Sequence, residues 1–510
     1  MSKLVLLTLG GSGERIVKSF IMQLASGIVL RDNNGNKMDV QIVFLDTDVK
    51  SKALQDAVSY ISEYRNLYDL HNNVVHQFHG RNATEMPMFS TNVLSPVRIT
   101  IDGAALGSLS QIYEVNNFDS DKKEEMDMLY SENAQNVDLK EGFIGMPNIG
   151  TIALNHLLKE DFNNVINGIA NDDKIFFVNS IFGGTGAAGF PLILNKLQQS
   201  LNLGNAANQR TLGCLTILPY FSFNQEVAGI VNKGGFTVDS AEFDSKTYAA
   251  FLYYNKHLHT NGISAQYSIG TNSRSGYAKC LGGANQDNPA HVLEYLAATS
   301  IFHFTKNAVP RDNNNTNVRY YEYWFGEGEN NVYNLMDIPE YENRKALVRL
   351  QLFEYLIQKE LKSYVKNNHG TFADQYDYCQ SGNNLTSCDT LINKYNVFFG
   401  YYDEWKKQMY KAEHTASMKF QFFNGYPGQN QSVTECFEPR INTTHKEGIW
   451  KRHEVVTDPD FLGKMSAAVE NLASRGWGEN RKNDFTLYLV QQSIEQALND
   501  NTSKKSINLN

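Results

Sequence analysis

The sequence has few cysteines, and their pattern indicates no structural use. The five cysteines among 510 residues are Cys214, Cys280, Cys379, Cys388 and Cys436. Their odd number, wide spacing and lack of a Cys-x-x-Cys pair indicate neither a disulfide framework nor a zinc site, so we expect reduced thiols. His71, His76 and His79 lie close together. Because no acidic or thiol ligand accompanies them at matching spacing, we interpret them as surface histidines.

Concentrated positive charge and long apolar runs are also missing. The formal net charge is −9, and the strongest basic cluster is Lys504-Lys505 in the tail. A sequence-independent nucleic-acid binder needs a basic face, so the charge argues against nucleic acid as a direct partner. No segment approaches about 18 uninterrupted apolar residues, and the opening strand is too short for the core of a signal peptide. We therefore expect a cytoplasmic protein without membrane insertion.

The apolar residues that are present predict an α/β fold. A chain of 510 residues with 42% hydrophobic content can bury two cores. Near-continuous apolar runs are typical of strands buried on both faces, as in a parallel sheet covered by helices. We predict strands at 4–9, 40–45, 174–181 and 212–218 and helices at 14–27, 149–169 and 189–201. This alternation is βαβ architecture.

The remaining patterns divide the chain. The irregular stretch 51–140 is interpreted as an insertion. Asn288 and Pro289 are typical of a helix start and open an apolar helix that ends near Phe304, which we interpret as a long central helix. A polar linker then marks a boundary between 305 and 320. We therefore predict a nucleotide-binding domain over 1–305, a smaller C-terminal α+β domain over 320–498, and a frayed tail over 499–510.

Three glycine-bearing turns follow strands or precede helices in the first domain. They span 10–13, 142–150 and 183–189. Glycines let backbone N–H groups approach phosphate oxygens, and a helix N-terminus adds partial positive charge. Asp46-Thr47-Asp48, at the end of the second strand, adds groups suited to a magnesium-bound water or a ribose. Since parallel strands end at one edge of the sheet, these segments together predict a site for a phosphorylated nucleotide.

The same segments carry a resemblance to a known family. Phe177-Val-Asn-Ser-Ile-Phe-Gly-Gly-Thr-Gly-Ala-Ala-Gly189 resembles the signature loop of the tubulin/FtsZ superfamily. Four further segments are similar to family segments and follow one another in the family's order. They are the turn after the first strand, Phe44-Leu-Asp-Thr-Asp48, the turn over 142–150 and Leu215–Glu226. The resemblance covers about residues 1–305. It implies a divergent bacterial tubulin-like protein that binds GTP or GDP with Mg²⁺, assembles head to tail into filaments and hydrolyses GTP at the subunit interface.

The resemblance also implies a set of site residues. Those implied to bind nucleotide are Gly10, Gly11, Ser12, Gly13, Glu14, Asp46, Thr47, Asp48, Gly145, Asn148, Gly183, Gly184, Thr185, Gly186, Phe223, Glu226, Asn288, His291 and Tyr295. Asp48 is implied to bind the metal through a water. For hydrolysis the resemblance implies carboxylates acting on the next subunit, and the candidates here are Asp337 and Glu340.

The sequence departs from the family pattern at several of these positions. Glu14 replaces an asparagine, which leaves guanine or another base preference open. Pro147-Asn148 stands in place of Asn-Pro-Glu in the loop implied to sense the γ-phosphate. His291 and Tyr295 are implied to stack on the base, but packing of this helix face against the sheet is the alternative. Asp337 and Glu340 equally fit the first turn of a helix as its cap and acidic residue.

Other functions stay open. A scaffold or sensor that binds nucleotide with little or no hydrolysis, in a defence or partitioning complex with other proteins, is the main alternative to a GTPase. Ile16 occupies the third glycine position of a dinucleotide-binding fingerprint, and no Gly-Lys-Ser/Thr follows any turn, which excludes a Rossmann dehydrogenase and a Walker A loop. A small-molecule α/β enzyme would require an acid/base pair or nucleophile at the strand ends, and we find no convincing arrangement of this kind.

Overall fold

The structure is a computed structural model of the 510-residue chain. It describes residues 2–48, 50–78, 86–99, 107–139, 142–143, 145–158, 160–201, 210–223, 240–258, 262–272, 274–278, 283–284, 286–310, 318–325, 332–334, 338, 340–361, 385–410, 419–421, 487, 490–492, 494–495 and 498–499. All structural statements below concern these residues.

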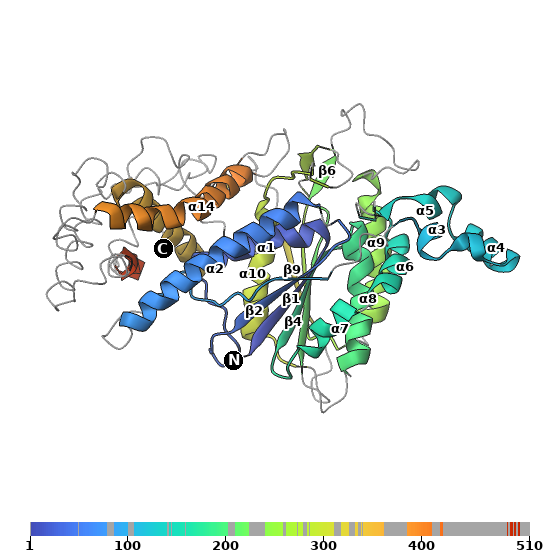
Figure 1. Ribbon diagram of the computed structural model, residues 1–510, viewed down its shortest axis with the longest axis horizontal. Coiled ribbons are helices and arrows are strands. Elements are labelled where there is room, and N and C mark those ends of the chain that lie inside the picture. The colour runs from blue at the N-terminus through green and yellow to red at the C-terminus, as the bar shows by residue number, and fades with distance from the viewer. Residues whose placement is uncertain are drawn as a thin grey trace, which may run out of the picture.

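A seven-stranded parallel sheet organises the first part of the chain (Figure 1). Its order is β3-β2-β1-β4-β5-β7-β9, and every neighbouring pair runs in parallel. The strands are β1 (Lys3–Leu9), β2 (Asp39–Leu45), β3 (Val97–Arg98), β4 (Lys174–Ser180), β5 (Thr211–Ile217), β7 (Ala265–Thr271) and β9 (Arg319–Phe325). β4 and β5 are buried at every residue, as their unbroken apolar runs require. The predicted α/β class with a parallel sheet is confirmed.

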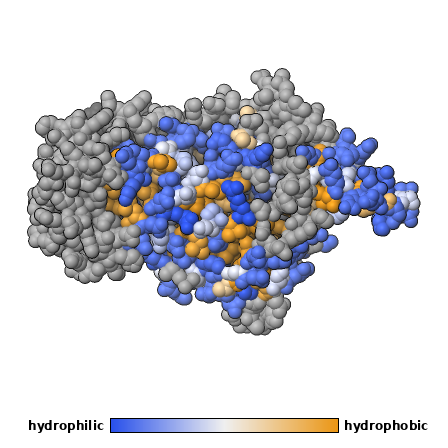
Figure 2. Space-filling model, in the orientation of Figure 1, coloured by the Kyte–Doolittle hydropathy of each residue, from blue (hydrophilic) through white to orange (hydrophobic). Residues whose placement is uncertain are grey.

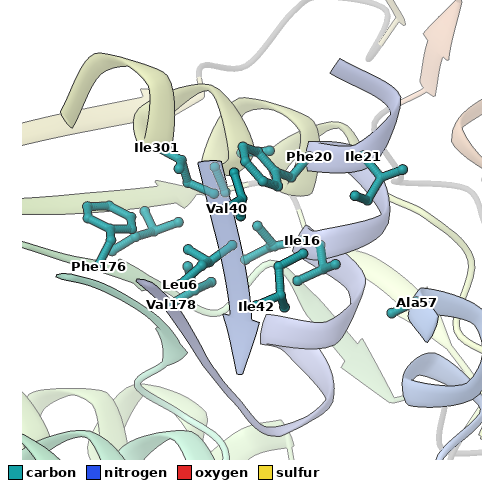
Figure 3. Packing of buried hydrophobic residues seen from close by; sticks show 14 of the residues in the cluster. Leu6, Ile16, Phe20, Ile21, Val40, Ile42, Ala57, Phe176, Val178 and Ile301 are labelled. Carbon is teal, nitrogen blue, oxygen red and sulfur yellow. The ribbon is translucent and has the colours of Figure 1, made fainter. Parts of the chain in front are cut away.

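Helices cover both faces of this sheet. α1 packs against α2 and α10 on one face, and α8 packs against α6 and α9 on the other (Figure 1). The helices are α1 (Gly10–Ala25), α2 (Lys52–Phe78), α6 (Pro147–Leu157), α7 (Glu160–Asn167), α8 (Gly184–Leu201), α9 (Phe243–Leu258) and α10 (Val292–Asn307). Figure 3 shows how α1 supplies Phe20 and Ile16 to the core between β1, β2 and α10. Cys214 on β5 is a buried free thiol.

Two boundaries differ from the prediction. The stretch 51–140 contains α2, which lies along α1, and β3, which extends the sheet, so this part belongs to the body of the domain. β9 pairs with β7 across its whole length, so the sheet continues past residues 305 and 320. The polar residues before β9 predict a boundary because a connection between two domains and a connection within one domain have the same composition.

The middle of the 51–140 stretch forms an arm that projects from the body beside α6 (Figure 1). It contains α3 (Leu109–Ile112), the 3₁₀-helix η1 (Val115–Asn117), α4 (Ser120–Leu129) and α5 (Glu132–Asn136). α3 contacts α5 and α6, which anchors the arm to the body. The term arm is used below for residues 107–138.

The C-terminal part packs on the α1 side of the molecule. It contains α11 (Tyr341–Tyr355), a π-helix (Leu356–Leu361), α14 (Leu385–Tyr410) and the parallel pair β10 (Val332–Asn334) and β11 (Lys419–Gln421). Trp405 on α14 is fully buried and donates from Nε1 to Ser19 Oγ of α1 at 3.2 Å. His71 of α2 is also buried and bonds to Tyr395 of α14 at 2.6 Å, so the prediction that it is a surface histidine is wrong.

The short elements near the sheet edge complete the fold. β6 (Phe221–Phe223) pairs in parallel with β8 (Ser275–Tyr277), and η3 (Ser240–Glu242) leads directly into α9. No helix in the described ranges combines the length and apolar character needed to cross a bilayer. The same ranges hold no group of three or more His, Cys, Asp or Glu side chains arranged to bind a metal.

Candidate functional site

A cavity of about 150 Å³ lies at the C-terminal edge of the sheet. The turn after β1, the end of β2, the turn after β4 and the segment before α6 all contribute to its wall. Of the residues predicted from the sequence, those that line it are Gly10, Gly11, Ser12, Asp46, Asp48, Gly145, Gly183, Gly184, Thr185, Gly186, Phe223 and Asn288. The fold therefore brings together segments that are far apart in the chain, at the edge where open α/β sheets bind ligands.

Three helix N-termini meet at this cavity. α1 begins at Gly10, α8 begins at Gly184, and α6 begins two residues after Gly145, and all three glycines line the wall. None of the three helices has an acidic residue in its first turn. Each N-terminus carries roughly half a positive charge and unpaired backbone donors, so the three together favour a bound anion.

The glycines are required because the turns touch one another. Gly10 has a φ of +71°, and a Cβ there would lie 3.2 Å from Thr185 Cβ. A Cβ at Gly184 would lie 3.1 Å from Gly145 N, and one at Gly186 would lie 2.6 Å from Ser180 O. Side chains at these positions would push the turns apart and fill the approach to the backbone donors.

Two carboxylates lie beside these turns in the lining of the cavity. Asp46 accepts hydrogen bonds at Oδ1 from Asp48 N at 3.2 Å and from Thr185 Oγ1 at 3.3 Å. Asp48 Oδ2 accepts from Gly283 N at 2.5 Å. Burial, together with the charge of Asp48, raises the pKa of Asp46 from 3.8 to about 7. A cation beside these groups would offset both effects, which is the setting expected for a metal that is completed by phosphate oxygens.

These residues fit Mg²⁺ held partly by the ligand. Mg²⁺ is bound in proteins by one or two carboxylates together with substrate phosphates and waters, rather than by an all-protein cage. Asp46, Asp48 and the Thr185 hydroxyl offer such a partial set beside the anion-binding wall.

Glu14 lies behind the cavity wall. It is 1% exposed, and its Oε2 accepts from Ser51 Oγ at 2.9 Å, while its Oε1 has no hydrogen-bond partner among the described residues. Burial, followed by the charges of Asp46 and Asp48, raises the pKa of Glu14 well above its usual value. Glu14 is therefore held near the acidic wall without lining the cavity, and its contact with a base remains a prediction.

Arg15 lines the cavity, although the sequence analysis did not identify it. Its Nε donates to Glu294 Oε1 at 2.7 Å, and its Nη2 donates to the hydroxyl of Tyr220 at 2.6 Å. That hydroxyl donates in turn to Glu294 Oε1 at 2.6 Å. This network, called the Arg15 network below, is almost fully buried, with Arg15 at 5% and Glu294 at 0% exposure. The one available signal was a cation two residues after the first glycine turn.

The residues predicted to contact the base occupy different environments. Asn288 lines the cavity, and its Nδ2 is buried without a hydrogen-bond partner in the described part of the chain. His291 is the N-cap of α10, bonded through Nδ1 to Leu293 N and through Nε2 to Ser275 Oγ. Tyr295 is fully buried, with its ring 6.0 Å from that of Trp405. The structure thus brings only Asn288 to the cavity.

The start of α10 also differs from the prediction. The helix begins at Val292, not at Asn288, because His291 and Glu294 form a capping box. Asn288 and Pro289 lie in the segment that leads to this cap, which leaves the Asn288 side chain free to face the cavity.

The other predicted residues lie around or away from the site. Gly13 packs against β4, since a Cβ there would lie 3.1 Å from Val178 O. Thr47 is buried and Asn148 is exposed, and neither lines the cavity. Glu340 is exposed at the N-cap position of α11 with a φ of +67°, away from the cavity. Glu226 and Asp337 lie outside the described residues.

The raised pKa of Asp46 predicts a pH effect on stability. The folded protein holds a proton on Asp46 between about pH 4 and pH 7 that the unfolded chain has lost, so this contribution to stability is present below pH 4 and disappears as the pH rises through about 7. The unfolding temperature of Asp46→Asn minus that of the wild type should therefore be larger at pH 8 than at pH 5, by at least about 2 °C. Both proteins are measured without nucleotide. The exposed Asp172→Asn is the matched control. An unchanged pH dependence in Asp46→Asn would contradict the argument.

Among the comparisons with known proteins, the one with solved structures finds similar chains. No family model matches the chain, and no curated protein matches it. One of the solved structures that it resembles is CetZ from Methanosaeta thermophila, at 9% sequence identity and a TM-score of 0.26. The match covers 59% of this chain and 52% of that one, so it spans about half the length of the CetZ chain.

Proposed function

We propose that this protein binds GTP with Mg²⁺ at the cavity, assembles head to tail, and hydrolyses the nucleotide at the contact between subunits. The observation that carries the proposal is the meeting of three helix N-termini, the Arg15 guanidinium and the Asp46–Asp48 wall around one cavity. A polyphosphate with a bound metal ion would match both sets of groups at once, since its anionic oxygens would meet the donors and its cation would be held by the carboxylates.

Different groups of the protein would bind the phosphates and the metal. The backbone donors at Gly10, Gly11 and Gly184–Gly186 would orient the phosphates, and the Arg15 guanidinium, held in place by Glu294 and Tyr220, would lie beside them as a further donor. Asp46 and Asp48, with the Thr185 hydroxyl, would hold Mg²⁺ directly or through waters. When bound, the metal would neutralise phosphate charge.

The unpaired Asn288 Nδ2 supports recognition of the base. A buried amide without a partner costs free energy, and a ligand that supplies an acceptor recovers it. An asparagine side chain offers a donor and an acceptor, which match the O6 and the N1 or N2 positions of guanine. The cavity of about 150 Å³ suits the phosphates rather than a whole nucleotide, so the base would lie beyond it, on the side of Asn288 and Phe223.

The position of Glu340, a candidate carboxylate for hydrolysis, supports hydrolysis at a contact between subunits. Burial lowers the pKa of His303 near the end of α10, and the charge of Glu340 opposes this shift, which places Glu340 close to that end. Asn288, at the cavity, precedes the other end, and the 16 residues of α10 span about 24 Å. Glu340 would therefore meet a nucleotide only in a second copy. Such head-to-tail contacts do not close and produce filaments.

A mixing experiment tests assembly and hydrolysis together. Phosphate release from GTP, with ATP as control, should rise per molecule as the protein concentration rises, in parallel with light scattering. Thr185→Ala and the double variant Asp337→Ala/Glu340→Ala should each be inactive, whereas their mixture should regain activity, because some contacts pair an intact cavity with intact carboxylates. Tight GTP binding with flat, negligible turnover would support the nucleotide-binding scaffold instead. Absence of GTP binding would contradict both functions.

A further inference from the structure

α4 on the arm has almost no contact with the rest of the protein. None of its ten residues is buried, and Met126 alone is half-buried. Its stability within the chain comes from an N-cap, in which Asp119 accepts from Lys122 N at 2.9 Å, and from the Lys122–Asp119 ion pair at 2.8 Å. Isolated helices shorter than about 12–15 residues are marginal in water, so α4 lacks the buried face that normally stabilises such a short helix.

Two large apolar side chains stand at the end of α4. Met128 is 87% exposed and Leu129 is 72% exposed, the highest values among the large hydrophobic residues described as exposed. They lie next to Asp127, which lines a groove of about 1190 Å³ between α3, η1, α4 and α5. The groove is polar, and its wall includes Lys123 together with the carboxylates of Glu114, Glu132 and Asp138, so its net charge is negative. An apolar pair therefore adjoins an acidic hollow.

The arm also concentrates the negative charge of the protein. Residues 107–138 contain eight carboxylates and two lysines, so they account for six of the nine net negative charges of the chain. Figure 2 shows a largely hydrophilic surface on this projection. The remainder of the chain is itself slightly acidic, so the charge of the arm favours a basic partner over a second copy of this protein.

We infer that the arm is a docking site for a basic amphipathic segment of a different protein. The apolar face of that segment covers Met128 and Leu129, and its lysine or arginine side chains enter the acidic groove beside Asp127. Covering α4 gives the helix the buried face that it lacks, and complementary charge gives the contact its orientation and its sensitivity to salt. This inference is independent of the nucleotide site.

A synthetic amphipathic helix of leucine and lysine is the probe, and its counterpart with glutamate in place of lysine is the control peptide. Fluorescence anisotropy measures binding to the full chain, and hydrogen exchange locates it. The lysine peptide should bind and slow exchange over residues 120–129, and high salt should weaken it. Met128→Ser/Leu129→Ser should reduce its affinity at least about tenfold. Leu252→Ser, at a residue 55% exposed on α9, should leave it unchanged.

Three results would overturn the inference. They are equal affinity for the double serine variant, protection outside the arm, and equal binding of the glutamate peptide. Sedimentation without peptide distinguishes the alternative occupant, because a dimer lost in Met128→Ser/Leu129→Ser would assign the surface to a second copy. Met128 and Leu129 are both exposed, so circular dichroism should show that the double variant keeps its fold.

Discussion

Replacing Glu294 by alanine is expected to lower the free energy of unfolding by about 3–5 kcal/mol. Glu294 is fully buried and accepts from Arg15 Nε at 2.7 Å and from the Tyr220 hydroxyl at 2.6 Å. Its removal leaves the Arg15 guanidinium buried without a counter-charge and also removes the acceptor of His291 N in the α10 capping box. Urea unfolding at neutral pH measures the loss.

Two control variants test whether the loss of stability comes from the unpaired buried charge. Glu342→Ala, at an exposed residue in the first turn of α11, should change stability by no more than about 0.5 kcal/mol. The double variant Arg15→Met/Glu294→Leu should be more stable than Glu294→Ala, because no unpaired charge remains. A loss below about 1 kcal/mol in Glu294→Ala would contradict the view of the Arg15 network as one buried unit.

Gly186→Ala is expected to weaken GTP binding by about a hundredfold or more. The alanine Cβ would lie 2.6 Å from Ser180 O and 2.9 Å from Ser180 N. Ser180 is the last residue of β4, and its backbone atoms cannot move aside as the end of a flexible side chain can. The first turn of α8 must therefore move, and its donors would leave the position proposed for the phosphates. Titration with a fluorescent GTP analogue measures the affinity.

Gly400→Ala is the matched control, because a Cβ at Gly400 on α14 meets no atom within 4 Å. This variant should bind GTP as the natural protein does, and its stability should be equal or slightly higher, since alanine favours a helix. Wild-type affinity in Gly186→Ala, with an unchanged circular dichroism spectrum, would show that the α8 turn does not bind phosphate.

The sheet was predictable because its signals are local. An apolar run such as that of β4 identifies a doubly buried strand without knowledge of its neighbours, and β1, β2 and β5 follow the same rule. β9 was missed because its pattern is largely exposed, with Tyr320 and Trp324 more than half exposed at the edge of the sheet. An edge strand with one neighbour carries no such run.

The site was predictable only in part for the same reason. Glycine-bearing turns can be recognised from the sequence, and glycines of all three turns line the cavity. The Arg15 network joins residues that are 205 and 279 positions apart, and no local pattern reports such pairings. The assignment of Tyr295 to the base depended on the resemblance and on helix spacing, and neither distinguishes a cavity from the packing of Tyr295 near Trp405.

Nucleotide binding at the cavity can be seen directly in a structure of the protein with Mg²⁺ and a non-hydrolysable GTP analogue. We expect the phosphates between the N-termini of α1, α6 and α8, with the metal on the side of Asp46 and Asp48 and the base toward Asn288. Phosphates bound elsewhere on the protein, or a cavity that stays empty at saturating analogue, would contradict this expectation.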